Sequence, residues 1–246
     1  MNPVDANTIV KNADNAWNYF DRIYCISLEE REDRRKAAAI QFSKVGLEGK
    51  VEFLIVKRHP FNVEQGTYEA HTTCLQKGLE AGAERIVVFE DDIIFDRFKT
   101  ERFRKCTQYL ADHPDWQVLL LGALIRSSQK TGESAVQKVR YQSLAHAYAL
   151  NRSYAKTLAY KAWTGVVFDT VFRTLTDHIY AVNPMFAFQG DLSTDNKYPG
   201  LYRFRKWCGG LERIQKANEF YQHHKFGIIA AHVLTLLFIV LLLRKY

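Results

Sequence analysis

The feature that most constrains this chain is a run of eighteen residues without a formal charge, residues 226–243, close to the C-terminal end. As an α-helix rising about 1.5 Å per residue, the run spans roughly 27 Å, which is close to the ~30 Å hydrocarbon layer of a bilayer. Residues 234–243 are apolar on every side, whereas a core helix of a soluble domain usually keeps a polar face. We therefore predict a single transmembrane helix over 226–243, with a buried core helix as the alternative. Basic residues that can reach the headgroups flank it: Lys225, Arg244 and Lys245.

The segment before this run, residues 203–225, is basic and rich in aromatic residues. It holds six Lys or Arg against Glu212 and Glu219, together with Trp207, Phe220 and Tyr221. Such a mixture suits the headgroup zone of a membrane, although an ordinary solvated helix has the same composition. We expect a juxtamembrane segment here, preceded by a globular domain over residues 21–202 and a polar N-terminal extension over residues 1–20.

The whole chain has 246 residues, of which 47% are hydrophobic, enough to bury one substantial core. Its net charge of +7 fits an anionic partner such as a nucleotide or an anionic lipid surface. The basic residues form no stripe interleaved with aromatics and no zinc-finger spacing, so nucleic acid is not expected as a partner.

The cysteines and the N-terminus bear on the compartment. Cys25, Cys74, Cys106 and Cys208 are far apart and form no Cys-x-x-Cys pair, so we expect reduced core residues rather than a zinc site or a disulfide framework. Residues 1–18 contain no apolar run that could act as a secretory signal. We therefore expect a membrane protein with a C-terminal anchor and a cytoplasmic domain, although both flanks of the span are basic and do not fix the orientation.

Strand and helix patterns alternate through the domain. Short β-rich runs at 22–28, 51–56, 85–89 and 117–121 are separated by helical patterns at 37–45, 67–81 and 96–111, with Gly46 and Gly82 as stops. Alternation of this kind predicts an α/β fold with a mostly parallel sheet flanked by helices. The second half is less regular: a polar stretch at 126–138 predicts a mobile loop near the site, followed by elements at 143–150, 153–162 and 166–175.

Three acids, Glu90, Asp91 and Asp92, follow directly on the apolar strand at 85–89. Ligands of open α/β sheets bind beyond the carboxyl ends of the strands, where these acids are predicted to lie. Adjacent carboxylates repel each other unless a positive group lies among them, and Mn²⁺ or Mg²⁺ accepts such oxygen ligands. The run predicts a metal site, with Asp92 and Glu90 as ligands. Simple capping of the following turn, by Asp92 or Asp96, is the alternative.

With these residues assembled, the chain resembles glycosyltransferase family 25, from about residue 22 to residue 196. The family's strand followed by Arg-x-Asp-Arg is similar to Ile26-Ser27-Leu28-Glu29-Glu30-Arg31-Glu32-Asp33-Arg34, with Ser27 where Asn is usual. Its Gly-Cys-x-x-Ser-His stretch resembles Gly66-Thr67-Tyr68-Glu69-Ala70-His71, and its Glu-Asp-Asp is matched by Glu90-Asp91-Asp92. Later segments resemble residues 147–155 and 168–172, then Gln189 and Thr194-Asp195.

The resemblance implies a glycosyltransferase A-like fold, a UDP-sugar donor, with galactose as the usual sugar, and inversion at the anomeric carbon. An inverting transfer needs a base for the acceptor hydroxyl. Asp169 is the first choice and Asp195 the reserve, although Asp169 also suits a helix N-cap or an exposed helix face. Residues expected to bind the donor are Ser27, Leu28, Arg31, Arg34, His71, Glu90 and Asp91. A membrane anchor favours a glycan acceptor such as lipopolysaccharide or another lipid-linked saccharide.

Two other functions share these patterns. Departures from the family pattern at Ser27, Thr67 and Ala70 fit an inactive relative that binds sugar nucleotides at a membrane or acts as a scaffold. An acidic strand end also occurs in phosphotransfer domains, but those need a downstream Lys in a suitable context, and we find no such pattern.

Overall fold

The computed structural model describes residues 16–190, 207 and 209–244. The reserve base Asp195, with its neighbour Thr194, therefore lies outside the described residues, and so do Cys208 and residues 203–206 of the predicted juxtamembrane segment. The other three cysteines are buried free thiols, as expected.

The predicted α/β fold class is confirmed. Within the described residues, six strands form one sheet in the order β2-β1-β3-β6-β5-β7. Its strand β1 is parallel to β2 and β3, β5 is parallel to β7, and β6 runs antiparallel to its neighbours, so the sheet is mostly parallel. The strands are β1 Arg22–Leu28, β2 Glu52–Val56, β3 Arg85–Glu90, β5 Val118–Lys130, β6 Val136–Asn151 and β7 Ile179–Val182.

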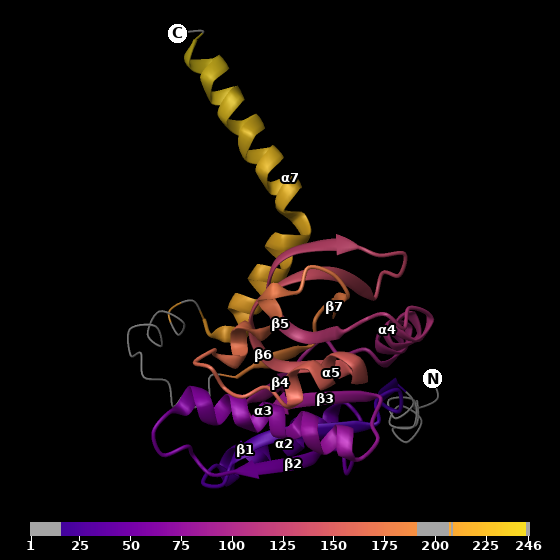
Figure 1. Ribbon diagram of the computed structural model, residues 1–246. Coiled ribbons are helices and arrows are strands. Elements are labelled where there is room, and N and C mark those ends of the chain that lie inside the picture. The colour runs from indigo at the N-terminus through magenta and orange to yellow at the C-terminus, as the bar shows by residue number, and fades with distance from the viewer. Residues whose placement is uncertain (1–15, 191–206, 208, 245–246) are drawn as a thin grey trace, which may run out of the picture.

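Helices cover this sheet (Figure 1). The crossovers from β1 to β2 and from β2 to β3 move in opposite directions across the sheet, so right-handed connections place α2 and α3 on opposite faces. The helices are α2 Glu32–Lys44, α3 Val63–Glu80, α4 Thr100–Asp112, α5 Arg152–Ala159 and a 3₁₀ helix η1 Phe168–Thr174. The glycines predicted as stops follow α2 and α3 and have left-handed backbones, with φ of 76° at Gly46 and 78° at Gly82.

The boundary predicted at residue 20 is too late. Ala16, Trp17 and Phe20 are buried in the core, and the Trp17 ring centroid lies 4.4 Å from that of Phe103. The indole Nε1 of Trp17 also donates to the carbonyl oxygen of Val45 at 2.9 Å. Because the residues around Trp17 are mostly polar, the sequence did not show that Trp17 packs in the core. The domain includes residues from at least position 16 on.

The mobile loop predicted at 126–138 is wrong. β5 continues to Lys130 and β6 begins at Val136, so the two strands form a hairpin with a short turn. The hydroxyl Oγ1 of Thr131 donates to the carbonyl oxygens of Glu133 and Val136 within this turn. The polar residues of the hairpin include exposed ones such as Lys130 and Arg140, but its β6 strand belongs to the core, since Val136 and Val139 are buried.

A second, two-stranded sheet lies next to the acids. The helix predicted from residue 96 begins only at Thr100, and the residues before it form β4, Ile93–Phe95, which pairs antiparallel with β8, Ala187–Gln189. The register Ile93↔Gln189 brings the side chain of Gln189 to the acidic run. This pairing, between segments far apart in the sequence, was not predicted.

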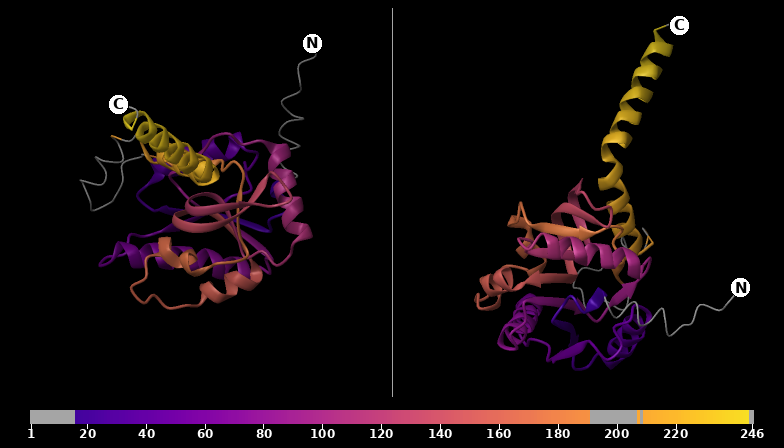
Figure 2. Two further views of the ribbon diagram at one scale, coloured as in Figure 1. Left: turned by 90° about the horizontal axis from the view of Figure 1, so that it is seen from above. Right: turned by 90° about the vertical axis from the view of Figure 1, so that its right-hand side faces the viewer.

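The long apolar C-terminal helix is present as α7, Leu211–Leu243 (Figures 1 and 2). Its first part packs against β5 and β8, where Gln215 and Glu219 are buried. Its second part projects from the domain, and its most apolar 18-residue window has 0% of its residues buried. Of the described residues, α7 alone forms a helix long and apolar enough to cross a membrane. Residues 211–225 thus belong to a docked helix rather than to a separate segment.

Candidate functional site

A cavity of about 290 Å³ opens beyond the carboxyl ends of β1, β2 and β3, at the sheet edge predicted for a ligand. Many of the predicted site residues line it. These are Ser27, Leu28, Arg34, His71, Glu90, Asp91 and Asp92, joined by Lys57, Arg58, His59, Val63, Gly66, Thr67, Ala70 and Gln189 among others.

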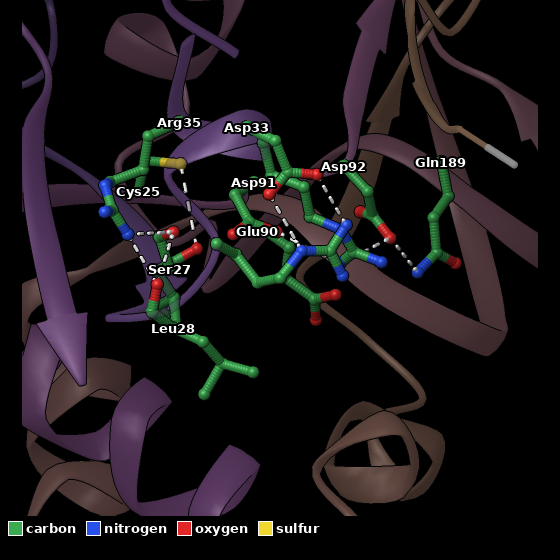
Figure 3. A network of polar contacts seen from close by, with 12 residues as sticks. Cys25, Ser27, Leu28, Asp33, Arg35, Glu90, Asp91, Asp92 and Gln189 are labelled. Carbon is green, nitrogen blue, oxygen red and sulfur yellow. Dashed lines mark hydrogen bonds and ion pairs between the residues drawn. The ribbon is translucent and has the colours of Figure 1, made fainter. Parts of the chain in front are cut away.

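Asp91 and Asp92 share one partner, Arg34, and Asp92 has a second, Gln189 (Figure 3). Oδ1 of Asp91 accepts a hydrogen bond from Nη1 of Arg34 at 3.2 Å, and the same nitrogen lies 3.9 Å from Oδ2 of Asp92. Oδ2 of Asp92 also accepts from Nε2 of Gln189 at 3.0 Å. The cation predicted among the acids is thus in part the protein's own guanidinium, contributed by the first turn of α2.

This guanidinium does not fully compensate the acids. Burial, followed by the charges of Asp169 and Asp91, raises the pKa of Glu90 to about 8, although Arg34 lowers it. Burial and the charge of Glu90 raise the pKa of Asp92 to about 7. The buried carboxyl group of Asp92 and the partly exposed one of Glu90 therefore favour a proton near neutral pH, or another positive charge beside them.

The acids provide a partial set of metal ligands. Among the residues that the structure describes, no three His, Cys, Asp or Glu side chains are grouped so that they could hold a metal ion by themselves. Oδ1 of Asp92, a residue that lines the cavity, is nevertheless buried without a hydrogen-bond partner. Because Mg²⁺ and similar ions often bind through one or two carboxylates plus substrate phosphates, the residues fit a cation that arrives with a diphosphate.

His71 is held inside the protein between an aromatic ring and two polar partners. Nδ1 lies 2.9 Å from the hydroxyl of Tyr148, Nε2 lies 3.3 Å from Oε1 of Glu90, and the ring stacks on Phe168 at a centroid distance of 4.0 Å. Burial lowers the pKa of His71 to about 3, so the ring is neutral. Through its Nε2 contact, the His71 ring orients the carboxyl group of Glu90.

Asp169, the predicted base, does not line the cavity described above. Its Oδ1 accepts a hydrogen bond from the backbone N of Ala145 at 2.8 Å, next to Leu144, whose φ of 70° is left-handed. The carboxyl group thus stabilises an irregular part of strand β6 around Leu144. It does not cap η1, whose N-cap is Val167, and it does not lie on an exposed helix face. It is close enough to raise the pKa of Glu90.

Arg35, which was not predicted as a site residue, holds the backbone at the end of β1 in place. Arg35 donates to the carbonyl oxygens of Leu28 and Glu29, and to the hydroxyl of Ser27 at 3.3 Å. Arg31, predicted to bind the donor, instead pairs with both carboxylate oxygens of Asp33 at 3.0 Å and does not line the cavity.

The opposite wall of the cavity is basic, and sequence reasoning missed it. Lys57, Arg58 and His59 follow β2 directly, and all three line the cavity. Nδ1 of His59 accepts from the backbone N of Asn62 at 2.9 Å, and a Cβ at Gly66 would lie 2.7 Å from the Cβ of His59. The loop and α3 approach so closely that Gly66 is required. A basic run immediately after a parallel strand was the available signal.

The structure resembles solved proteins at a low level. No family model matches the chain, and no curated protein matches it. Structures that do match include A197 from STIV, at 10% identity and a TM-score of 0.42 over 68% of this chain and 83% of that one. A mannose-1-phosphate geranyltransferase from Thermus thermophilus matches at 12% identity and a TM-score of 0.44, over 65% and 72%.

A glycosyltransferase involved in the glycosylation of the major capsid of PBCV-1 matches at 10% identity and a TM-score of 0.34, over 55% of this chain and 62% of that one. TM-scores of this size carry no argument about activity. Membership of family 25 stays a prediction, and the case for a function depends on the cavity itself.

Proposed function

We propose that the chain is a sugar-nucleotide-dependent transferase, and specifically an inverting, metal-dependent glycosyltransferase with the cavity as its donor site. The observation that carries this proposal is the polarity of the cavity. Lys57 and Arg58 line one wall, and Glu90 and Asp92, with their raised pKa values, line the other. A nucleoside diphosphate with a divalent cation matches both walls, because the phosphates pair with the basic residues and the cation pairs with the carboxylates.

In this proposal the chain's own residues bind and orient the donor. Arg34 holds Asp91 and Asp92 in place, Gln189 fixes one oxygen of Asp92, and His71 fixes Glu90. Asp92 and Glu90 would hold Mn²⁺ or Mg²⁺, which when bound neutralises charge that develops on the leaving diphosphate. The sugar, by the family resemblance, is galactose, and the acceptor is lipopolysaccharide or another lipid-linked saccharide at the membrane that α7 enters.

The test is UDP release from a panel of UDP-sugars by the full chain, with and without Mn²⁺. We expect metal-dependent turnover with one sugar and its loss in Asp92→Asn, which preserves the shape of the side chain. Asp33→Asn is the matched control, because Asp33 lies outside the cavity and pairs with Arg31. Turnover that is equal in wild type and Asp92→Asn, or that ignores Mn²⁺, would refute the proposal.

A second candidate is a membrane-bound protein that binds sugar nucleotides without turning them over. The position of Asp169 favours it, because the predicted base is bonded to the Ala145 backbone and does not line the cavity. Calorimetry separates the two functions. Tight UDP binding with Mn²⁺, but no release of UDP from any UDP-sugar with a range of glycan acceptors, would identify the binding protein.

A further inference from the structure

The hairpin of β5 and β6 lies beside the turn of α7 that precedes the apolar run. Asn218 of α7 accepts from the backbone N of Ile125 at 2.8 Å and donates to its carbonyl oxygen at 3.1 Å. Further along, the hydroxyl of Ser128 donates to the carbonyl oxygen of Gln222 at 3.3 Å. β5 and α7 thus advance in the same direction, side by side.

Their register gives the height of the hairpin tip. Between the two contacts, three residues of β5 (Ile125 to Ser128) match four residues of α7 (Asn218 to Gln222), because the strand is inclined to the helix. Continued from the contact between Ser128 and Gln222, this register places Lys130 about level with Lys225, just before the apolar run begins. Figure 1 likewise shows the hairpin at the end of the domain from which α7 projects.

The hairpin is basic. Arg126, Lys130 and Arg140 are exposed, and Lys138 is half-buried beside Asp177, with which it forms an ion pair. Its one acid, Glu133, is engaged within the turn, where Oε1 accepts from the backbone N of Ala135 at 2.9 Å.

We propose that the β5–β6 hairpin, residues 126–140, is a second membrane contact that places its basic side chains on anionic lipid headgroups beside the entry point of α7. The proposal rests on the membrane anchor put forward under the proposed function. Each Lys or Arg near an anionic surface strengthens binding by about fivefold, and the anchor already holds the hairpin at high local concentration. Attachment at two points restricts rotation of the domain about α7, and so fixes the direction in which the cavity faces.

The experiment uses the full chain in lipid nanodiscs, with a fluorophore on Ser134→Cys at the exposed hairpin turn and a quencher on the lipid headgroups. Cys208→Ser removes the fourth thiol, since Cys25, Cys74 and Cys106 are buried. The matched control carries the label on Glu48→Cys, which is exposed and precedes β2, at the sheet edge far from β5. We expect strong quenching of the Ser134 label in anionic discs, little in zwitterionic discs, and little at Glu48 in either.

Charge reversal then tests the chemistry. Lys130→Glu with Arg140→Glu should shift the ratio of membrane-bound to free hairpin by about 25-fold or more, and circular dichroism checks that the domain stays folded. Equal quenching at both label positions in anionic discs, or quenching unaffected by the reversal or by lipid charge, would overturn the hairpin contact. A chain that fails to enter discs would instead refute the anchor itself. Both results differ from loss of UDP release, which concerns the donor site alone.

Discussion

Gln215 connects the C-terminal helix to the acidic cluster, so its replacement should alter metal dependence and not only stability. Oε1 of Gln215 accepts from the backbone N of Gln189 at 3.0 Å, and Nε2 of Gln189 donates to Oδ2 of Asp92 at the same distance. The backbone N of Gly190 also donates to the carbonyl oxygen of Asp92, at 2.7 Å. A side chain of α7 is therefore two hydrogen bonds away from a proposed metal ligand.

Gln215→Leu removes the acceptor and leaves the part-buried backbone N of Gln189 without this partner. An unsatisfied buried group costs about 1–3 kcal/mol, and the loss is offset in part because Nε2 of Gln215 is itself buried without a partner. We expect the free energy of unfolding to fall by about 1 kcal/mol. Because groups that support metal ligands affect metal affinity by about 10- to 100-fold, Gln189→Ala should raise the half-saturating Mn²⁺ concentration about tenfold, and Gln215→Leu, one bond further away, about threefold.

The control is Asn218→Ala, about one turn of α7 away from Gln215, which removes two hydrogen bonds to Ile125 but none near Asp92. Mn²⁺ titration of UDP binding by calorimetry, together with urea unfolding, separates the two effects. Asn218→Ala should lower stability at unchanged Mn²⁺ dependence. If both variants shift the Mn²⁺ dependence equally, or if Gln215→Leu leaves it unchanged, the proposed link between α7 and the site is refuted.

Three further predictions concern the fold and the anchor. Gly122→Ala should destabilise the domain by about 1–3 kcal/mol or more in urea unfolding, because its Cβ would lie 1.6 Å from the carbonyl oxygen of Ala187. The control Gly132→Ala, whose Cβ would lie in open space, should change stability little. Trp17→Ala should cost about 3–5 kcal/mol by the same measurement, and a smaller loss would show that residues before β1 are not part of the core. A chain ending at Lys225 should stay in solution without detergent, as judged by sedimentation, and should keep the docked part of α7, as judged by circular dichroism. Aggregation of this variant would contradict a purely membrane-facing role for residues 226–243.

The first half of the fold could be predicted because local patterns decide it. β1, α2, β2 and β3 follow apolar runs and glycine stops, and the acids at the end of β3 lie where a parallel sheet places them. The start of α3 was placed four residues late, although Asn62 caps it by accepting from the backbone N of Glu64 at 2.9 Å. An Asn three residues before a Gln was the unused signal.

The second half was less predictable because long-range pairing decides it. β4 pairs with β8 across more than ninety residues, and the docking face of α7 is polar, with Gln215, Asn218 and Glu219 bonded to the domain. No hydrophobic periodicity marks such a face, so residues 211–225 read as a headgroup segment. Polar docking of this kind is visible only when the partner backbone groups are known.

The structure changes the reason for expecting a cation in the cavity, and the cation itself stays a prediction. The sequence suggested that a metal must compensate the repulsion between the neighbouring acids. In the structure, the guanidinium of Arg34 compensates part of that repulsion. The remaining reason to expect a cation is the negative charge of the proposed ligand. A diphosphate drawn in by Lys57 and Arg58 would lie in the same cavity as Glu90 and Asp92, and it would repel these carboxyl groups whenever they are ionised. A divalent cation held by Asp92, whose Oδ1 has no hydrogen-bond partner, would reduce this repulsion, so donor and metal should bind cooperatively, each raising the affinity of the other by the same factor.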